Sequence, residues 1–156
     1  RNAEYILMEN ELKKVVLSIG SNIGKREHNI ALAYEYVEKH IGQILKSSSF
    51  YESPSQGFVS NNDFINSCIA VETNAECKDI LAKIHWIEHS MGRKKTKDVY
   101  EDRIIDIDII FYQDSIINEK DLKVPHPKYH ERDFVLTPLK ELNFLEDPRT
   151  GFQKSN

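Results

Sequence analysis

Apolar residues recur along the chain in two patterns, and each pattern predicts a different kind of element. Between Arg26 and Ile41 they fall at Ile30, Tyr34, Val37 and Ile41, which is the spacing of one face of an amphipathic helix. Short apolar runs bounded by Gly, Ser, Asn or Pro instead predict strands. The predicted elements are strands at Val15–Gly20, Ile44–Tyr51, Phe64–Thr73 and Ile104–Phe111, helices at Arg26–Ile41 and Glu76–Met91, and a short last helix at Pro138–Leu145.

The order of these elements is β-α-β-β-α-β with a tail. This order predicts an α+β fold of the ferredoxin-like kind, in which helices pack on a sheet, followed by a C-terminal loop and a short helix. Residues 1–13 lack a clear period and are expected to form a poorly anchored extension. Since no repeat, low-complexity segment or Pro/Ser-rich linker divides the chain, residues 1–156 are expected to form a single domain.

Composition narrows the classes of function. The 156 residues are 40% hydrophobic and carry a formal net charge of -4, which argues against a nucleic-acid-binding protein, because such domains are usually basic. No apolar run approaches the length of a membrane span, and no signal peptide is evident. Cys68 and Cys77 lack metal-ligand spacing and are expected to be buried free thiols, as fits a cytoplasmic protein.

Two aspartates interrupt the most apolar predicted strand, which reads EDRIIDIDII at positions 101–110. Asp106 and Asp108 point to the same face of a strand, with Cα atoms roughly 6.6 Å apart, while the isoleucines between them point to the other. Two neighbouring carboxylates in an apolar setting repel each other, so they either share a proton or bind a cation. Mg²⁺ suits such oxygen ligands. The alternative is an edge strand whose aspartates are merely solvated.

Basic residues flank this strand and favour the metal interpretation. Arg103 precedes it, Arg93 begins the charged loop 93–102, and His126 and Arg132 follow in the proline-containing loop 122–134. Guanidinium groups match phosphate oxygens, and a basic loop beside a carboxylate pair suits transfer from a nucleoside triphosphate. A solvated run of charges is the alternative for the loop.

Three further groups are less specific. Gly20, Ser21 and Asn22 end the first strand, where glycine backbone can approach a ligand, although a plain turn explains them as well. Ser53-Pro54, Gly57, Phe64 and Asn66 have the residue types that stack on and hydrogen-bond a flat heterocycle, or alternatively a core aromatic and a turn cap. His85, Glu88 and His89 share one side of the second helix and are expected to be surface polar residues.

The full set of motifs resembles the 6-hydroxymethyl-7,8-dihydropterin pyrophosphokinase family over about Val15–Leu145. The motifs that carry the resemblance are IGSNIG (19–24), SSFYESPSQG (48–57), FINSCIAVET (64–73), IEHSMGR (87–93), DRIIDIDII (102–110), VPHP (124–127) and ERDFVLTPL (131–139). No single motif is specific, but their order and spacing are.

The resemblance implies an enzyme of tetrahydrofolate biosynthesis that transfers a pyrophosphoryl group from ATP to 6-hydroxymethyl-7,8-dihydropterin and releases AMP. It implies two Mg²⁺ ions as cofactors, ATP as co-substrate, and no nucleic-acid or membrane partner; we expect a monomer. It further implies metal ligands at Asp106 and Asp108, catalytic arginines at Arg93 and Arg103, ATP contacts at His85, Glu88, Arg93, Arg103, His126 and Arg132, and pterin contacts at Ser53, Pro54, Gly57, Phe64, Asn66, Tyr100 and Phe134.

The chain departs from the family pattern at three places. Tyr100 stands where many members have a tryptophan that closes over the pterin, Glu101-Asp102 replaces a common Gly-Pro pair, and His85 replaces a frequent glutamine. Two other classes of protein remain open at this point. A non-catalytic ligand-binding module would not need the two aspartates in an apolar strand, and a metal-dependent phosphohydrolase would not need the group formed by Phe64, Asn66 and Phe134.

Overall fold

The structure is a computed structural model, and it describes residues 11–54, 63–93, 103–143 and 147–148. The main sheet contains five strands in the order β2-β4-β1-β5, with β3 also paired to β4. The elements, in chain order, are β1 (Lys13–Ser21), α2 (Arg26–His40), β2 (Gln43–Ser47), β3 (Tyr51–Ser53), β4 (Phe64–Thr73), α3 (Cys77–Ser90), β5 (Asp106–Tyr112), β6 (Ile117–Asn118), β7 (Lys123–Val124), the 3-10 helix η1 (Tyr129–Glu131) and α4 (Asp133–Leu142).

The strand order confirms the predicted ferredoxin-like α+β topology. β1 lies between β4 and β5 and is antiparallel to both, and β2 is antiparallel to β4 on the far side. Because β4 separates β1 from β2, the first βαβ unit is split, as the βαββαβ order requires. β5 therefore lies at one end of the sheet and β2 at the other.

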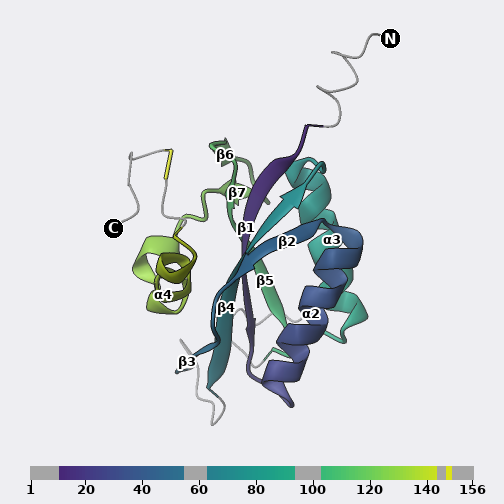
Figure 1. Cartoon of the computed structure of the whole chain (residues 1–156), viewed down its shortest axis with the longest axis vertical. Helices are drawn as coiled ribbons and strands as arrows, with labels where there is room; N and C mark the ends of the chain where they lie inside the picture. The colour runs from purple at the N-terminus through teal and green to yellow at the C-terminus, as the bar shows by residue number, and fades with distance from the viewer. Residues whose placement is uncertain (1–10, 55–62, 94–102, 144–146, 149–156) are drawn as a thin grey trace.

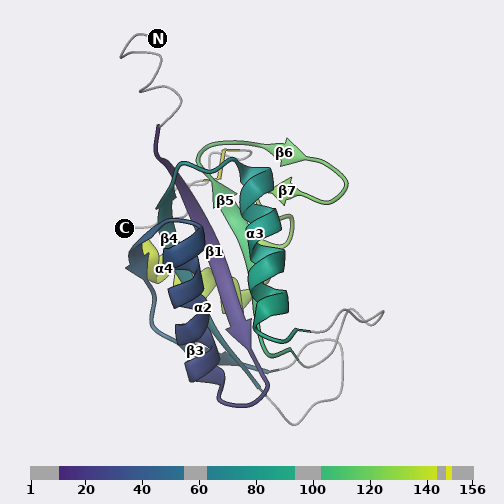
Figure 2. The same ribbon diagram turned by 90° about the vertical axis from the view of Figure 1, so that its right-hand side faces the viewer.

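The described elements form three layers (Figure 1). Helices α2 and α3 cover one face of the sheet and α4 covers the other, as the rotated view in Figure 2 also shows. The larger apolar core lies under α2 and α3 and includes Ile30, Ile84 and Ile107, while a smaller core joins Val16 and Ile110 to α4. The apolar stripe of each helix thus faces the sheet, which is why both long helices formed where their period predicted.

Four expectations about the elements were wrong. The predicted strand Ile44–Tyr51 is two strands, β2 and β3, because the chain leaves the ladder between Ser47 and Tyr51. The last helix begins at Asp133 and not at Pro138, which lies inside it. The supposed loop 122–134 therefore contains β7, η1 and the start of α4, and β1 begins at Lys13, inside the expected extension.

In the described parts of the chain, no helix combines the length and the apolar character needed to cross a membrane.

Candidate active site

The aspartate pair lies on β5 and faces the α4 side of the sheet. Asp106 is aligned with Gly20 and Asp108 with Ser18 on β1, and Ser18 is aligned in turn with Cys68 on β4. Aligned residues point to the same face, and Cys68 belongs to the core under α4. Both side chains are partly buried. The strand is at a sheet edge, yet its aspartates are not merely solvated.

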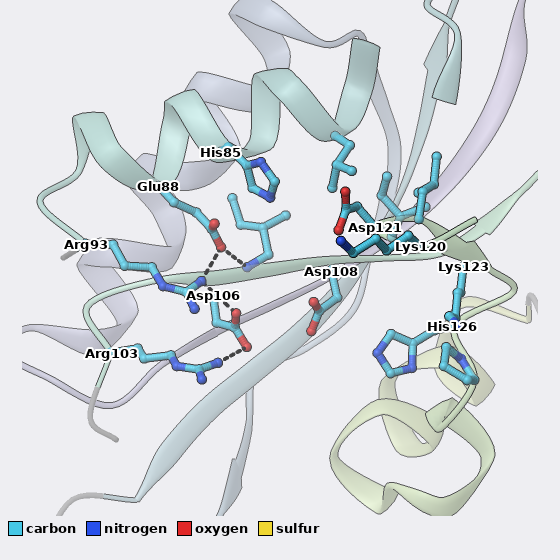
Figure 3. Close-up of a pocket in the computed structure, with 15 residues that line it drawn as sticks. His85, Glu88, Arg93, Arg103, Asp106, Asp108, Lys120, Asp121, Lys123 and His126 are labelled. Atoms are coloured by element: carbon cyan, nitrogen blue, oxygen red, sulfur yellow. Dashed lines mark hydrogen bonds and ion pairs between the residues drawn. The ribbon is translucent and has the colours of Figure 1, made fainter. Parts of the chain in front are cut away.

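Two arginines neutralise Asp106 (Figure 3). Arg93 Nη1 donates to Oδ1 of Asp106 at 2.9 Å, and Arg103 Nη1 lies 3.3 Å from Oδ2. The same Nη1 of Arg93 also donates to Glu88 Oε2 at 2.6 Å. Arg93 therefore joins a carboxylate on α3 to a carboxylate on β5. Gly92, with φ of 96°, adopts the left-handed conformation that directs the chain from the end of α3 to Arg93.

Glu88 was expected on the surface, and that expectation was wrong: the residue is only 8% exposed. Its Oε2 accepts the backbone N–H of Ile107 at 2.9 Å. Because β5 is the end strand of the sheet, this N–H has no neighbouring strand to accept it, and Glu88 takes that place. Burial raises the pKa of Glu88 to about 7, although Arg93 and the Ile107 N–H act against the shift. His85 and His89 are exposed as expected.

Asp108 has a different environment from Asp106. Within the described residues, no side chain or backbone group donates a hydrogen bond or forms an ion pair with its carboxylate. Burial, followed by the negative charges of Asp106 and Glu88, raises the pKa of Asp108, and the positive charges of Arg132 and Arg103 only partly oppose this. Once ionised, this side chain is a carboxylate that lacks a close cation, which is the condition under which a metal ion binds favourably.

A cavity of about 430 Å³ opens over these groups (Figure 3). Its wall combines carboxylates with basic groups from α3, β5 and the β6–β7 hairpin. Sequence reasoning missed the hairpin contribution, because no local pattern shows which loop folds over the site. The lining residues are Leu81, His85, Glu88, Arg93, Arg103, Asp106, Ile107, Asp108, Ile109, Lys120, Asp121, Leu122, Lys123, His126 and Pro127.

His126 lies beside Asp108, on the side of the cavity away from Arg93 and Arg103 (Figure 3). The His126 backbone N–H donates to Ile110 O at 2.9 Å, which docks this segment on the edge of β5. Its Nδ1 accepts the N–H of Lys128 at 3.1 Å, so a neutral ring carries its proton on Nε2. Arg132 does not line the cavity, but its guanidinium carbon is 5.6 Å from the ring centroid of Phe134.

The turn after β1 holds Arg103 in place. Asn22 Oδ1 accepts the Arg103 backbone N–H at 2.6 Å, and the Asn22 N–H donates to Arg103 O at 3.0 Å. Asn22 is itself buried. Gly20 and Ser21 are thus the last residues of β1, and Asn22, directly after the strand, positions the basic residue before β5.

A second group of predicted residues lies on the same face of the sheet. Asn66 is 3% exposed and donates from Nδ2 to Ser53 Oγ at 2.7 Å. Asn66, Gly20 and Asp106 form one row across β4, β1 and β5. A Cβ on Gly20 would lie 2.8 Å from Asn66 Oδ1 and 3.5 Å from the Phe64 ring. The bare glycine therefore keeps the surface open between the amide and the carboxylate.

The remaining predicted residues fall into two sets. Phe134 is the second residue of α4, which covers this same face, and both Phe64 and Phe134 are partly exposed, as a stacking surface requires. Pro54 is exposed beside Ser53. Gly57 and Tyr100 lie outside the described residues, as do the lysines of the charged loop.

The described residues of the site fit a magnesium ion. No group of three or more His, Cys, Asp or Glu side chains in the described segments is arranged to hold a metal. Mg²⁺, however, commonly takes only one or two protein carboxylates and completes its shell with water and substrate phosphate. Asp106 and Asp108 on one face, with Asp108 lacking a close cation, meet that requirement.

Fold and site together define an enzyme of the phosphoryl-transferring class, in which carboxylates and arginines line a cavity of about 430 Å³. A family model for 7,8-dihydro-6-hydroxymethylpterin-pyrophosphokinase (HPPK) matches residues 16–144. The chain belongs to this family.

Individual relatives agree with the family model. The chain is 38% identical over 133 residues to the 2-amino-4-hydroxy-6-hydroxymethyldihydropteridine pyrophosphokinase of Porphyromonas gingivalis, covering 82% of this chain and 89% of that protein. It is 40% identical over 128 residues to the enzyme of the same name from Aquifex aeolicus, covering 82% and 79%. Among solved structures, it superposes on wild-type HPPK-DHPS of Plasmodium falciparum with a TM-score of 0.69 at 19% identity, covering 85% of this chain and 39% of that one. This last likeness shows the fold.

Proposed function

We propose that this site transfers a pyrophosphoryl group from ATP to 6-hydroxymethyl-7,8-dihydropterin, giving the pterin diphosphate and AMP in tetrahydrofolate biosynthesis. The observation that carries the proposal is the row Asn66–Gly20–Asp106. It sets groups suited to a flat heterocycle beside groups suited to a metal–triphosphate, on one face of one sheet. A hydrolase would need only the second set.

We assign the metal-binding role to the Asp106 end of the row and the pterin-binding role to the Asn66 end. Asp106 and Asp108 would hold Mg²⁺, as two ions, and the metal would supply positive charge that offsets the charge on the phosphates. The pterin would stack between Phe64 and Phe134. Its polar edge would meet Asn66, with Ser53, Pro54 and Gly57 beside it and Tyr100 as an aromatic cover.

The arginines are proposed to bind and orient the triphosphate. Arg93 uses Nη1 for both of its carboxylate partners, so its other N–H groups are available for phosphate oxygens, and Arg103 offers a second planar fork. His126, donating from Nε2, and Arg132 would contact the phosphates from the opposite side. Glu88 and His85 would line the nucleotide end, with Glu88 keeping Arg93 in place.

The protein contributes mainly position and charge. The acceptor hydroxyl must meet the β-phosphorus in line, and fixed cations lower the energy of the charge that develops there. No described side chain in the cavity stands out as a general base other than the carboxylates already engaged. We further propose that residues 1–156 act as one pyrophosphokinase domain and as a monomer. The free, buried Cys68 and Cys77 suit the reducing cytoplasm.

The product of ATP tests the function directly. Purified protein with ATP, Mg²⁺ and 6-hydroxymethyl-7,8-dihydropterin should release AMP and the pterin diphosphate, which chromatography with mass detection resolves. Formation of ADP would contradict the proposal, and so would phosphate release that does not depend on the pterin. A protein that binds both substrates without turnover would be the ligand-binding module instead.

A further inference from the structure

A carboxylate on α4, outside the cavity, makes an unusually complete set of contacts with the chain between β2 and β3. Both oxygens of Glu141 accept the Ser49 backbone N–H, at 2.9 and 3.0 Å. The Ser49 hydroxyl lies 3.4 Å from Oε2, and the Tyr51 hydroxyl donates to Oε1. These three donors come from two residues some 90 positions away in the sequence, so the contact is purely tertiary.

The contact replaces sheet bonds that this part of the chain lacks. Ser48 still pairs with β4, because its N–H donates to Cys68 O at 2.9 Å and its Oγ accepts the Cys68 N–H at 3.0 Å. Beyond Ser48 the chain leaves the ladder, and pairing resumes only at Tyr51. Glu141 supplies the acceptor for the Ser49 N–H, which falls inside this break.

The strand that follows the break carries one wall of the proposed pterin pocket. β3 has only three residues and pairs only with β4 among the described strands, aligning Tyr51 with Asn66 and Ser53 with Phe64. Three residues of ladder hold a strand weakly. The hydrogen bond from Asn66 to Ser53 therefore depends on how well other contacts hold β3.

The helix that carries Glu141 also carries the opposite wall. Phe134 and Glu141 are seven residues apart, so they lie on the same side of α4, two turns from each other. Val135 and Leu139 anchor the helix on the smaller core. One helix thus presents Phe134 to the pocket and the carboxylate to β3.

The other side of β3 has a separate anchor. Successive side chains of a strand alternate between faces, so Glu52 points away from Glu141. Arg26, at the start of α2, lies 3.5 Å from Glu52 Oε1 and donates to Asp63 O at 2.8 Å. The α2 side of β3 is thereby held without Glu141, whereas the α4 side is held through Tyr51.

We propose that Glu141 is a positioning residue for the pterin pocket: it fixes β3 against α4, and so keeps Ser53 and Asn66 at a set distance from Phe134. The inference rests on the proposed function and names a residue that acts only through Tyr51 and Ser49. Hydrogen bonds from Tyr51 and Ser49 lower the pKa of Glu141, so the group is a carboxylate at neutral pH. Loss of the contact should weaken pterin binding and leave ATP binding almost unchanged.

Steady-state kinetics on three single variants and one double variant test this assignment. Glu141→Ala removes the whole contact, and Tyr51→Phe removes one donor while keeping the Ser49 bonds. Glu35→Gln, an exposed glutamate of α2 on the other face of the sheet, is the matched control. The KM for the pterin, the KM for ATP and kcat are measured for each, together with thermal unfolding to report the folded fraction.

We expect Glu141→Ala to raise the pterin KM about five- to tenfold, with the ATP KM changed less than about twofold. Tyr51→Phe should give a smaller change of the same kind, and combining it with Glu141→Ala should add nothing. An unchanged pterin KM, or an equal change for both substrates, overturns the assignment; if Glu141→Ala does not fold, Tyr51→Phe decides. A wild-type protein that releases no AMP refutes the proposed function instead, so the two failures are distinct.

Discussion

Asp106 and Asp108 are two residues apart, yet their surroundings predict that replacing each by asparagine will shift stability in opposite directions. Asp106 is paired with Arg93 at 2.9 Å and Arg103 at 3.3 Å. Asp108 has no such partner among the described residues, and burial next to Asp106 and Glu88 raises its pKa to about 8. Asparagine keeps the size of each side chain and removes the charge.

The magnitude follows from the pKa of Asp108. Its ordinary value is 3.8, so at pH 7 the unfolded chain is ionised while the folded protein resists ionisation. At about 1.36 kcal/mol per pKa unit, the interval from 3.8 to pH 7 sets an upper limit of about 4 kcal/mol. Partial exposure reduces this to about 1–3 kcal/mol. Asp108→Asn should therefore raise Tm by about 3–9 °C in metal-free buffer.

Asp106→Asn should act in the reverse direction. It leaves Arg93 and Arg103 without their shared carboxylate, and a partly buried guanidinium that loses its partner costs about 1–3 kcal/mol. Both variants should lose AMP production by about 10³-fold or more, because each removes a proposed metal ligand. A gain in stability with a loss of activity is the combination expected only for Asp108.

Thermal unfolding in EDTA between pH 5 and pH 8 measures the effect. The stabilising effect of protonated Asp108 is complete below about pH 3.8 and is lost as the pH rises through the folded pKa, so the wild-type Tm should fall over this range. Asp108→Asn should show a flatter profile, and Mg²⁺ should raise the Tm of the wild type but not of this variant. If Asp108→Asn is no more stable than wild type at pH 7, the electrostatic account of the pair is wrong.

Three further changes test other parts of the site. Gly20→Ala places a Cβ 2.8 Å from Asn66 Oδ1 and should raise the pterin KM about tenfold or more with little change in the ATP KM, in the same steady-state assay. Asn22→Ala removes the 2.6 Å acceptor of the Arg103 N–H and should lower kcat about tenfold while the protein stays folded, as circular dichroism would verify. Burial raises the pKa of the Cys68 thiol to about 12, so as the pH rises above 9 the unfolded chain loses this proton before the folded protein does. The free energy of unfolding should therefore fall with rising pH. In denaturant titrations, the free energy of unfolding of Cys68→Ala should fall less steeply than that of the wild type, by about 1 kcal/mol per pH unit.

The parts of the fold that were predicted correctly are those set by local periodicity. The helical spacing of Ile30 and Val37 predicted α2, and that of Ile80 and Ile84 predicted α3. Both predictions were correct because a helix with one apolar side packs that side against the sheet. The last helix was predicted to begin at Pro138, and that start was wrong, because Pro138 lies inside the helix. In the structure the helix begins five residues earlier, where Asp133 provides an acidic first turn.

The parts of the site that were missed depend on contacts between distant segments. Glu88 was predicted to be a surface residue because nothing near it in the sequence indicates its partner. That partner is the backbone N–H of Ile107, nineteen positions away on the end strand β5, which donates a hydrogen bond to Glu88. Lys120, Asp121 and Lys123 gave no signal, since only the folded β6–β7 hairpin brings them to the cavity. Side-chain spacing on one strand was predictable, whereas the partner that fills an open edge was not.

The sheet itself sets the distance between the two halves of the proposed site. Asn66 and Asp106 occupy the same row on either side of β1, so two interstrand spacings, roughly 10 Å in all, separate their Cα atoms. Hydrogen-bonded strands hold such a distance more rigidly than loops do. Because Gly20 has no side chain to stand between them, a heterocycle anchored at Asn66 can extend a substituent along the row toward the aspartates. In the proposed reaction, the register of three strands would therefore determine which atom of the acceptor meets the phosphate.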